Sequence, residues 1–305
     1  MSDTVDVFII GAGMAGLAAA EEAARCGLSV AMAEETMFGG MAVNVNHLSP
    51  RIEGMPASGS DFAADATTRV SDLGVDILFE AVIGFAPQAD GLLEVAMASG
   101  SRRARTVVVA SGAKPRALGV PGEQEFENRG VSHCADCDAP MLKGQTVVVV
   151  GGGDSALQES LVLAQFCPVV HLVHRGASFT ARADFIAAVG KEQRITVHLR
   201  TVVDALEGIA GLEAAKLRDL ALDTQQTLAC KGFFAYVGLV PNLDAVPAAV
   251  ALQDGAVRVD ECMESSAKNV YSIGAARAGY GGQIPDTISD AKCAVTAICT
   301  RLGRM

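Results

Sequence analysis

The chain has 305 residues, enough for two cores, because domains cluster near ~100–150 residues and a single core stops growing near ~250–300. Half of the residues are hydrophobic and 19% are charged, which excludes a disordered or low-complexity chain. The 24 basic and 35 acidic residues give a formal net charge of -11, so the surface as a whole repels nucleic acid and anionic lipid. We therefore expect a folded protein that binds neither nucleic acid nor a membrane.

Signals for membrane insertion or secretion are missing from the sequence. The apolar run near its start, Val7–Ala20, is shorter than the ~20 residues that cross a bilayer. No basic residue precedes Arg25, whereas a signal peptide places a basic stretch before its apolar one. The eight cysteines are too sparse and irregular for a secreted disulfide framework. These observations predict a cytoplasmic location.

The first elements follow a nucleotide-binding pattern. Val5–Ile10 is typical of a buried strand, and Leu17–Cys26 of an alanine-rich helix. Ser29–Ala33 predicts a second strand that ends at Glu34. Three glycines lie between the first strand and the helix: Gly11, Gly13 and Gly16. Glycines allow a tight turn and close approach to a pyrophosphate, the helix start supplies N–H donors, and the carboxylate accepts from ribose hydroxyls. The pattern favours a dinucleotide site over a merely tight strand–helix turn.

The next stretch is mostly strand. Asp76–Met97 contains strand-like segments interrupted at Pro87, and Thr106–Ala110 is an apolar strand that ends in a Ser-Gly-Ala turn. Turn residues at Val120–Glu123 are typical of a crossing between domains. We place a domain boundary near residue 113.

Cys134 and Cys137 form a C-x-x-C pair. At the start of a helix such a pair can close a disulfide ring, and the helix terminus can lower a thiol pKa from ~8.5 to ~7 or below. Asp138, the next residue, can carry a proton to a leaving thiolate. The alternatives are half of a zinc site, for which only His133 is a nearby ligand, or two inert cysteines. The spacing favours a redox pair, with no metal site, and the other six cysteines are expected to be small core residues.

A second nucleotide-binding pattern follows. Thr146–Val150 predicts a buried strand, Leu157–Phe166 a helix, and Val169–His174 another strand. The intervening turn reads Gly151, Gly152, Gly153, Asp154, Ser155 and Ala156. Alanine is allowed at the third glycine position of this fingerprint. Two nucleotide units indicate a flavin paired with a nicotinamide, between which a hydride passes.

The remaining elements complete an α/β fold with two Rossmann-like, three-layer nucleotide-binding domains, one inserted in the other. Gly232–Asn242 is a strand followed by Gly238 and Pro241, which indicates the return crossing. Asn269–Ile273 predicts a strand, and a helix is expected from about Pro285. We expect a discontinuous domain over residues 1–112 and 246–305, and an inserted domain over residues 113–245.

Taken together, these motifs resemble the low-molecular-weight thioredoxin reductases, which are class II FAD-dependent pyridine nucleotide-disulfide oxidoreductases. The resemblance covers essentially the whole chain and rests on these segments in order: Gly11–Gly16, Gly39-Gly40, Ala110–Ala113, Val120–Glu123, Gly130–Asp138, Gly151–Ala156, His174-Arg175 and Gly238–Asn242. It implies that residues 1–112 and 246–305 form a discontinuous FAD-binding domain, and that residues 113–245 form an inserted nicotinamide-binding and dithiol domain. It also implies a homodimer, and two domains that swivel so that the dithiol and the nicotinamide take turns at the flavin.

The resemblance also implies roles for particular residues. Cys137 is the thiol nearest the flavin, Cys134 attacks the external disulfide, and Asp138 is the general acid. The flavin contacts are Gly11, Gly13, Gly16, Glu34, Gly40, Gly112, Gly274 and Gln283. The nicotinamide contacts are Gly151, Gly153, Asp154, Ser155, Ala156, His174 and Arg175. His133 stands where an aromatic residue is usual, either as a base that keeps a thiolate ionised or as a surface histidine.

Several positions depart from the family pattern. Of the arginine cluster that clamps the 2'-phosphate of NADPH, only Arg175 remains, because Gly176 and Thr180 replace the others. Arg182, two residues further on, is a possible substitute. NADPH, NADH and the absence of a nicotinamide donor therefore all stay open. Ala275 replaces an aspartate that contacts the flavin, and losing one charge-assisted hydrogen bond costs roughly 1.5 to 3 kcal/mol.

The leading hypothesis is an FAD-dependent dithiol-disulfide oxidoreductase. Its electrons pass between FAD and the Cys134/Cys137 pair and then to a thioredoxin-like protein or another disulfide. One alternative is a small-molecule dithiol oxidase, which forms a disulfide in a natural product and passes electrons to oxygen. The other is a non-catalytic binding protein that has lost the flavin, which Ala275 motivates. The sequence leaves the partner and the direction of electron flow open.

Overall fold

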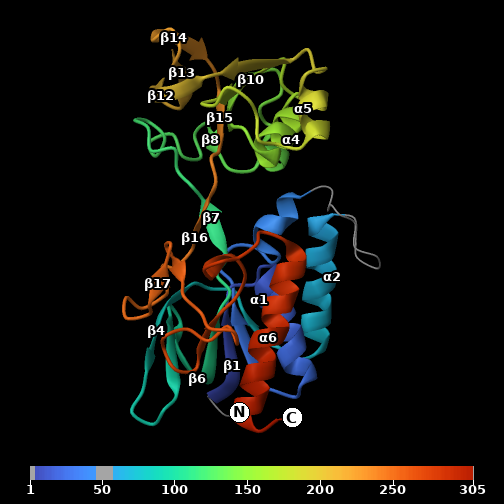
Figure 1. Cartoon of the computed structure of the whole chain (residues 1–305), viewed down its shortest axis with the longest axis vertical. Coiled ribbons are helices and arrows are strands. Elements are labelled where there is room, and N and C mark those ends of the chain that lie inside the picture. Colours follow the sequence, from blue (N-terminus) through green and yellow to red (C-terminus); the bar gives the residue numbers. More distant parts are fainter. Residues whose placement is uncertain (1–3, 46–57, 305) are drawn as a thin grey trace. The chain divides into compact units, whose positions relative to one another are not determined.

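The computed structural model describes residues 4–45 and 58–304 (Figure 1). Within these residues, no helix combines the length and the apolar character that a membrane span requires. The chain divides into two compact units: Met1–Lys114 with Val240–Met305, and Pro115–Leu239. The α/β fold class with Rossmann-like units is confirmed, because each unit contains a parallel sheet with helices packed against it.

The first unit is built on a seven-stranded sheet with the order β3-β2-β1-β6-β5-β4, in which β19 also pairs with β6. The strands are β1 (Thr4–Ile10), β2 (Val30–Ala33), β3 (Asp76–Leu78), β4 (Val82–Pro87), β5 (Leu93–Met97), β6 (Gly100–Val109) and β19 (Val270–Ser272). β1, β2, β3, β6 and β19 pair in parallel, whereas β5 pairs antiparallel with β6 and with β4. Pro87, which lacks an N–H donor, is tolerated as the last residue of β4 at the sheet edge.

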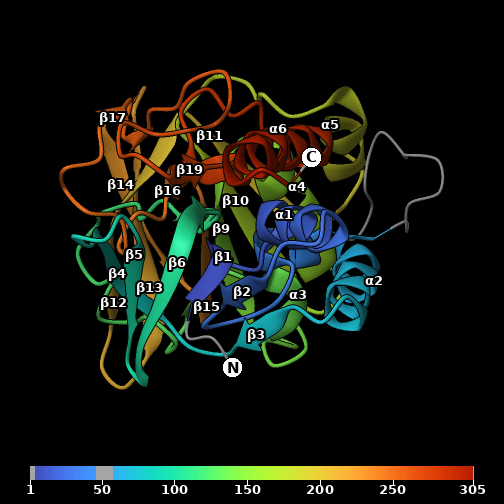
Figure 2. The ribbon, with the colours of Figure 1, turned by 90° about the horizontal axis from the view of Figure 1, so that it is seen from below.

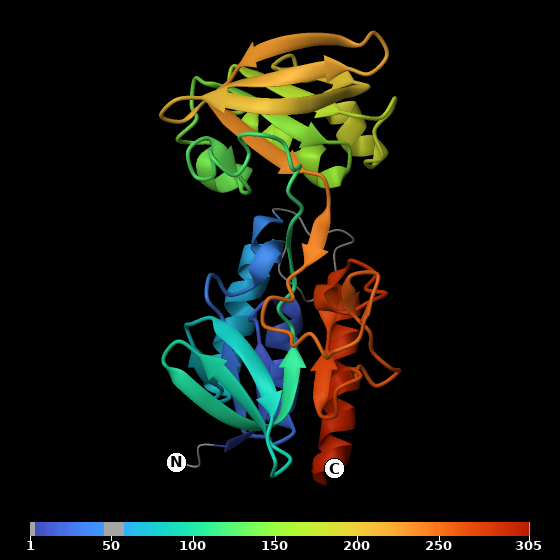
Figure 3. The ribbon, with the colours of Figure 1, turned by 90° about the vertical axis from the view of Figure 1, so that its left-hand side faces the viewer.

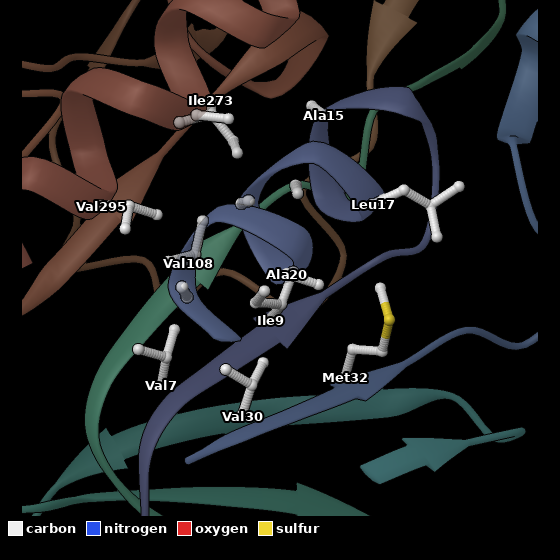
Figure 4. Close-up of a cluster of buried hydrophobic side chains, with 14 of the residues drawn as sticks. Val7, Ile9, Ala15, Leu17, Ala20, Val30, Met32, Val108, Ile273 and Val295 are labelled. Atoms are coloured by element: carbon white, nitrogen blue, oxygen red, sulfur yellow. The ribbon is translucent and has the colours of Figure 1, made fainter. Parts of the chain in front are cut away.

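Both faces of β1 are buried, which explains its continuous apolar run. Val7 and Ile9 belong to one core cluster, and Phe8 belongs to another on the opposite face, as the two-residue period of a strand requires. The first cluster joins β1 to the helices α1 (Met14–Arg25), α2 (Gly59–Asp72) and α6 (Ile284–Leu302) (Figure 2). Figure 4 shows its side chains from β1, α1 and α6. α1 and α6 pack side by side through small residues such as Ala20 and Ala294.

The second unit contains a five-stranded sheet with the order β11-β10-β9-β15-β8, all of it parallel. Its strands are β8 (Val131–Ser132), β9 (Thr146–Gly151), β10 (Val169–His174), β11 (Ile195–Leu199) and β15 (Gly232–Tyr236). A three-stranded antiparallel sheet of β12 (Thr201–Gly208), β13 (Leu212–Asp219) and β14 (Thr224–Ala229) covers one of its faces (Figure 3). The other face packs on the helices α3 (Ala135–Asp138), α4 (Asp154–Leu163) and α5 (Ala183–Val189).

The chain passes between the two units twice, and the two passages pair with each other. β7 (Ala113–Pro115) and β16 (Leu239–Pro241) form a two-stranded sheet. Beside it, the Arg116 N–H donates to the Gly238 carbonyl and the Asn242 N–H to the Gly112 carbonyl, both at 2.9 Å. Three short elements remain in the first unit: a hairpin of β17 (Leu252–Gln253) and β18 (Ala256–Val257), and the 3-10 turns η1 (Gly40–Asn44) and η2 (Gly274–Ala276).

The expectation that the six other cysteines are core residues is only partly right. Cys167, Cys230 and Cys299 are buried, but Cys26 and Cys262 are exposed. Cys26 caps the carboxyl end of α1, and Cys262 lies in a turn where its N–H donates to Asp260.

Candidate active site

The first glycine turn connects β1 to α1, and two of its glycines are required by close backbone approach. Gly11 has φ +99°, and a Cβ there would lie 2.5 Å from the Ala110 carbonyl oxygen. A Cβ on Gly16 would lie 1.9 Å from the Gly11 carbonyl oxygen. A side chain at either position therefore collides with the backbone of this unit itself.

Gly13 differs, because a Cβ there would meet nothing within 4 Å. It is the N-cap of α1, and no side chain caps this helix. The N–H groups of the first helical turn have no partner within the helix. Open space at an uncapped helix start fits a pyrophosphate, so the residues present fit the phosphate part of FAD.

Glu34 lies at the end of β2, against this turn. Its Oε2 accepts from the Ala12 N–H at 2.9 Å, and its Oε1 accepts from the N–H and the hydroxyl of Thr36, both at 2.9 Å. The Gly39 N–H donates to the Ala12 carbonyl at 2.7 Å, and a Cβ on Gly40 would lie 3.3 Å from the Gly13 Cα. The structure thus brings Glu34 and Gly40 to the first glycine turn.

The start of α6 lies near the same turn. Gly274 has φ +62°, and a Cβ there would lie 2.8 Å from the Ala15 Cβ in α1. The Gly274 N–H donates to Asp290 Oδ2 at 3.0 Å. Gln283 is the N-cap of α6, and its side chain closes a capping box with Asp286. Gly112 has φ +69° with open space around its Cβ position, and its carbonyl is part of the passage between the units.

Cys134 and Cys137 form a disulfide in the second unit, with their Cα atoms 5.3 Å apart. Cys134 is the N-cap of α3, and its Sγ accepts from the Cys137 N–H at 3.2 Å. Its own N–H donates to the Ser132 hydroxyl at 3.2 Å. Cys134 is half-buried, Cys137 is exposed, and Asp138 follows directly at the end of α3. A disulfide with one exposed cysteine can exchange with an external thiolate.

His133 is exposed and its ring is turned towards a carboxylate. Nε2 lies 3.2 Å from Glu127 Oε1. The structure therefore places the imidazole next to Cys134 in the chain, but with an acidic partner of its own.

Glu159 is a buried carboxyl group on α4, which packs against α3, the helix of the cysteine pair. The sequence patterns did not indicate it. Only 6% of the residue is exposed. Burial, and then the negative charge of Asp136, raise the pKa of Glu159 to about 7, against a smaller lowering by Gln158. Burial and the charge of Glu159 also raise the pKa of Tyr236 on β15. A glutamate in the second turn of an apolar helix is the signal that could have found this site.

The second glycine turn, between β9 and α4, has the same features as the first. A Cβ on Gly151 would lie 2.5 Å from the Tyr236 carbonyl oxygen and 2.7 Å from the Ala156 Cβ, so position 151 requires glycine. Gly153 has open space at its Cβ position and is the N-cap of α4, which again has no side-chain cap. Asp154 and Ser155 are exposed in the first turn of α4. This cradle fits the pyrophosphate of a second dinucleotide.

Beside the cradle, β10 ends at His174, and its imidazole fills the space above two glycines. A Cβ on Gly152 would lie 2.3 Å from the ring, and one on Gly176 would lie 2.6 Å from Nε2. Nε2 also hydrogen bonds with the Ser178 carbonyl at 3.1 Å. Arg175 follows and is exposed. The ring thus lies against both glycines.

No group of three or more His, Cys, Asp or Glu residues in the described part of the chain is arranged to hold a metal ion. The predicted site residues gather at three places: the first glycine turn, the dithiol helix and the second glycine turn.

Comparisons with known proteins agree with this chemistry. A family model described as pyridine nucleotide-disulphide oxidoreductase matches residues 5–296. The chain is 33% identical over 307 residues to the thioredoxin reductase of Treponema pallidum, covering 100% of this chain and 99% of the relative. It is 31% identical over 290 residues to the thioredoxin reductase of Listeria monocytogenes, covering 93% and 90%. The solved thioredoxin reductase of Lactococcus lactis superimposes with a TM-score of 0.91 at 26% identity, covering 99% and 100%. None of these three is described as a dithiol oxidase or a non-catalytic protein, so neither alternative is favoured.

Proposed function

Because this chain belongs to the pyridine nucleotide-disulphide oxidoreductase family, in its low-molecular-weight thioredoxin reductase class, we propose that its dithiol reduces the disulfide of a thioredoxin-like protein. The chain is an FAD-dependent disulfide oxidoreductase that works with a nicotinamide nucleotide. The observation that carries the proposal is the Cys134–Cys137 disulfide at the start of α3, with Cys137 exposed.

Each cofactor has a proposed set of holding residues, and the two open glycine cradles support the assignment. FAD is held in the first unit by Gly11, Gly13, Gly16, Glu34, Gly40, Gly112, Gly274 and Gln283. The nicotinamide nucleotide is held in the second unit by Gly151, Gly153, Asp154, Ser155, Ala156, His174 and Arg175. When bound, FAD supplies a two-electron carrier between the nicotinamide and the disulfide. On this assignment residues 1–112 and 246–305 form the FAD-binding domain, and residues 113–245 form the inserted domain.

The dithiol step follows from ordinary thiol chemistry. The Cys134 thiolate attacks one sulfur of the substrate disulfide, the substrate S–S bond breaks, and the leaving thiolate takes a proton. Cys137 then attacks the Cys134 sulfur, which re-forms the ring disulfide and releases the second substrate thiol. Asp138, adjacent to Cys137, is the proposed proton donor to the leaving thiolate. His133 is the proposed cation that favours the thiolate of Cys134.

Trapping the mixed disulfide tests this proposal. We expect Cys137→Ser to accumulate a covalent adduct between Cys134 and a thioredoxin-like substrate, because the resolving thiol is missing, while FAD stays bound. Mass spectrometry of the adduct identifies the linked cysteine, and turnover with NADPH or NADH is expected to be lost. Cys262→Ser, at an exposed cysteine outside the dithiol, is the matched control and keeps full turnover. Unchanged turnover of Cys137→Ser, or an adduct on another cysteine, excludes the dithiol from the mechanism.

The proposal also covers the location and the oligomeric state of the protein. We propose a cytoplasmic homodimer, which the resemblance to the reductase class supports. Light scattering on the purified holoenzyme measures the oligomeric state, and a monomeric mass at micromolar concentration would contradict the dimer.

A further inference from the structure

The Glu159 side chain lies on the face of α4 that packs into the core of the second unit. Glu159 follows Ala156 by three residues, so the two side chains share one face of the helix. Ala156 belongs to the same core cluster as Ala135 in α3 and Ala139 at the end of α3. The buried carboxyl group is therefore on the side of α4 that packs against α3, the helix of the cysteine pair.

Among the described residues, acidic and phenolic groups surround Glu159. After burial, the charge of Asp136 on α3 is the cause that raises its pKa. Burial and then the charge of Glu159 raise the pKa of Tyr236 on β15, and a hydrogen bond with the Ala135 backbone lowers it. Asp136 and Asp138 raise it further. Tyr236 thus reaches α3 as well as facing Glu159, and these groups form one cluster beside the disulfide.

The other elements that pack on α4 bring no counter-charge to this cluster. The residues of β9 and β10 in this core are apolar. At the start of α4, Asp154 lies 3.3 Å from Arg182, which also lies 3.5 Å from Asp184 in α5. Asp136 is the one charged side chain among the described residues that shifts the pKa of Glu159, and it is an acid. A buried carboxylate without a cation is costly, and groups held in this way gather at functional sites.

A carboxyl group that titrates near neutral pH beside a dithiol exchanges charge with it. Reduction of a disulfide can leave one sulfur as a thiolate, and a new negative charge makes a neighbouring carboxylate bind a proton more tightly. An ionised carboxylate in turn disfavours the thiolate. The two groups then share one proton and titrate as a pair.

We infer that Glu159 takes up a proton when the Cys134–Cys137 disulfide is reduced and releases it when the disulfide re-forms. The inference rests on the proposed function, in which electrons reach this disulfide through FAD. Two electrons break the S–S bond, one solvent proton converts one sulfur to a thiol, and a second goes to Glu159 while the other sulfur stays a thiolate. When a substrate disulfide re-oxidises the pair, these two protons balance the two substrate thiols that form. Glu159 acts through its charge, so it is a positioning residue.

The pH dependence of the reduction potential of the cysteine pair tests this. The holoenzyme is equilibrated with mixtures of reduced and oxidised dithiothreitol. Alkylation and mass spectrometry give the reduced fraction of the peptide that contains Cys134 and Cys137. Each proton taken up with two electrons changes the equilibrium constant tenfold per pH unit, which is about 30 mV. We expect the wild type to take up two protons, with a slope of about 60 mV per pH unit from about pH 6 to about pH 8.5.

Glu159→Gln cannot take up the proton, and it removes the charge that disfavours the thiolate. Its slope is expected to fall to about 30 mV per pH unit, at a pH about one unit lower than any such fall in the wild type. Glu159→Asp keeps a carboxyl group on this face of α4 and is expected to restore part of the wild-type profile. Glu192→Gln is the matched control, because it removes a less buried acid of the same unit and should keep the wild-type profile.

A purely structural role of Glu159 would change the stability of the fold but not this slope. Identical profiles for the wild type and Glu159→Gln would overturn the inference, as would an equal loss of slope in Glu192→Gln. None of these measurements uses a nicotinamide nucleotide or a thioredoxin-like substrate, so failure of the proposed function is recognised separately by the Cys137→Ser trap.

Discussion

Arg277 and Asp290 form a two-point ion pair in the first unit, with Nε to Oδ2 and Nη2 to Oδ1 both 2.7 Å. The Asp290 side chain is 4% exposed, and the same carboxylate accepts from the Gly274 N–H. Asp290→Asn leaves the guanidinium without its charge partner, so we expect the free energy of unfolding to fall by about 3 to 5 kcal/mol. Urea titration of the holoenzyme measures it.

An exposed ion pair supplies the control for this change. Lys114 and Asp244 lie 2.9 Å apart, with side chains 50% and 80% exposed. Asp244→Asn is expected to cost at most about 1 kcal/mol, because water screens the pair. If both variants lose the same free energy, burial of the Arg277–Asp290 pair has no energetic consequence.

Glu159 makes stability depend on pH. Its pKa rises from 4.5 in the unfolded chain to about 7 in the folded one, chiefly through burial. The folded state therefore holds the proton more tightly, and this contribution to stability is full below pH 4.5 and is lost as the pH rises through 7. Glu159→Gln cannot ionise, so its free energy of unfolding should exceed that of the wild type by up to about 3 kcal/mol more at pH 8 than at pH 4.5.

Urea midpoints of the two proteins at both pH values give this difference. Glu192→Gln is a suitable comparison, because Glu192 is an acid of the same unit that is less buried than Glu159, and hydrogen bonds from Arg194 lower its pKa. Parallel pH profiles for the wild type and Glu159→Gln would show that Glu159 remains charged in the folded state.

Two glycines of the first turn should respond differently to alanine. Gly13→Ala meets no protein atom within 4 Å, so the apoprotein should change stability by no more than about 1 kcal/mol, while retention of FAD should fall. Gly16→Ala places its Cβ 1.9 Å from the Gly11 carbonyl, so the apoprotein itself should be destabilised. Flavin absorbance after gel filtration, together with thermal unfolding of the apoprotein, separates the two effects. Full flavin retention by Gly13→Ala would show that the pyrophosphate does not bind at this glycine turn.

His133 should influence thiol reactivity weakly. His133→Gln removes the cation next to Cys134 and is expected to shift the pH midpoint of iodoacetamide alkylation of the reduced enzyme upwards. The shift should stay below about one pH unit, because both His133 and its partner Glu127 are largely exposed. Alkylation is followed by mass spectrometry of the Cys134 peptide. An unchanged midpoint would leave His133 as a surface partner of Glu127.

Strands and helices with a continuous apolar pattern could be predicted from the sequence. Their exact first and last residues were harder to predict. β10 begins and ends at the residues expected, Val169 and His174. Both helices after the glycine turns begin three residues earlier than expected, at Met14 and Asp154. The reason is that the third small residue of each turn belongs to the first turn of the helix, where it allows the helix to approach the strand.

Other elements have no strong local signal. β14 is almost entirely polar and exposed, and it becomes a strand because it pairs with β13, not because it buries a face. α2 shows a helical spacing in Phe62, Ala66 and Val70, but its apolar face is narrow. Pairing between strands distant in the sequence cannot be read from either segment alone.

The same distinction between local and long-range signals applies to the residues of the candidate site. The cysteine pair and the two glycine turns are contiguous motifs, so the sequence alone indicates them. Asp290 and Glu159 matter because residues far away in the chain bury them. Only the folded chain brings those partners together.

The packing of α1 against α6 has a consequence for biosynthesis. These helices share one core, yet one is made within the first 25 residues and the other is completed near residue 302. Domains generally fold as the ribosome releases them. Pro115–Leu239 leaves the ribosome as an uninterrupted segment and can close its own sheet, whereas the part of α1 that packs on α6 stays uncovered until α6 has been made. The nascent chain therefore exposes this part of the first core after the second unit can already fold.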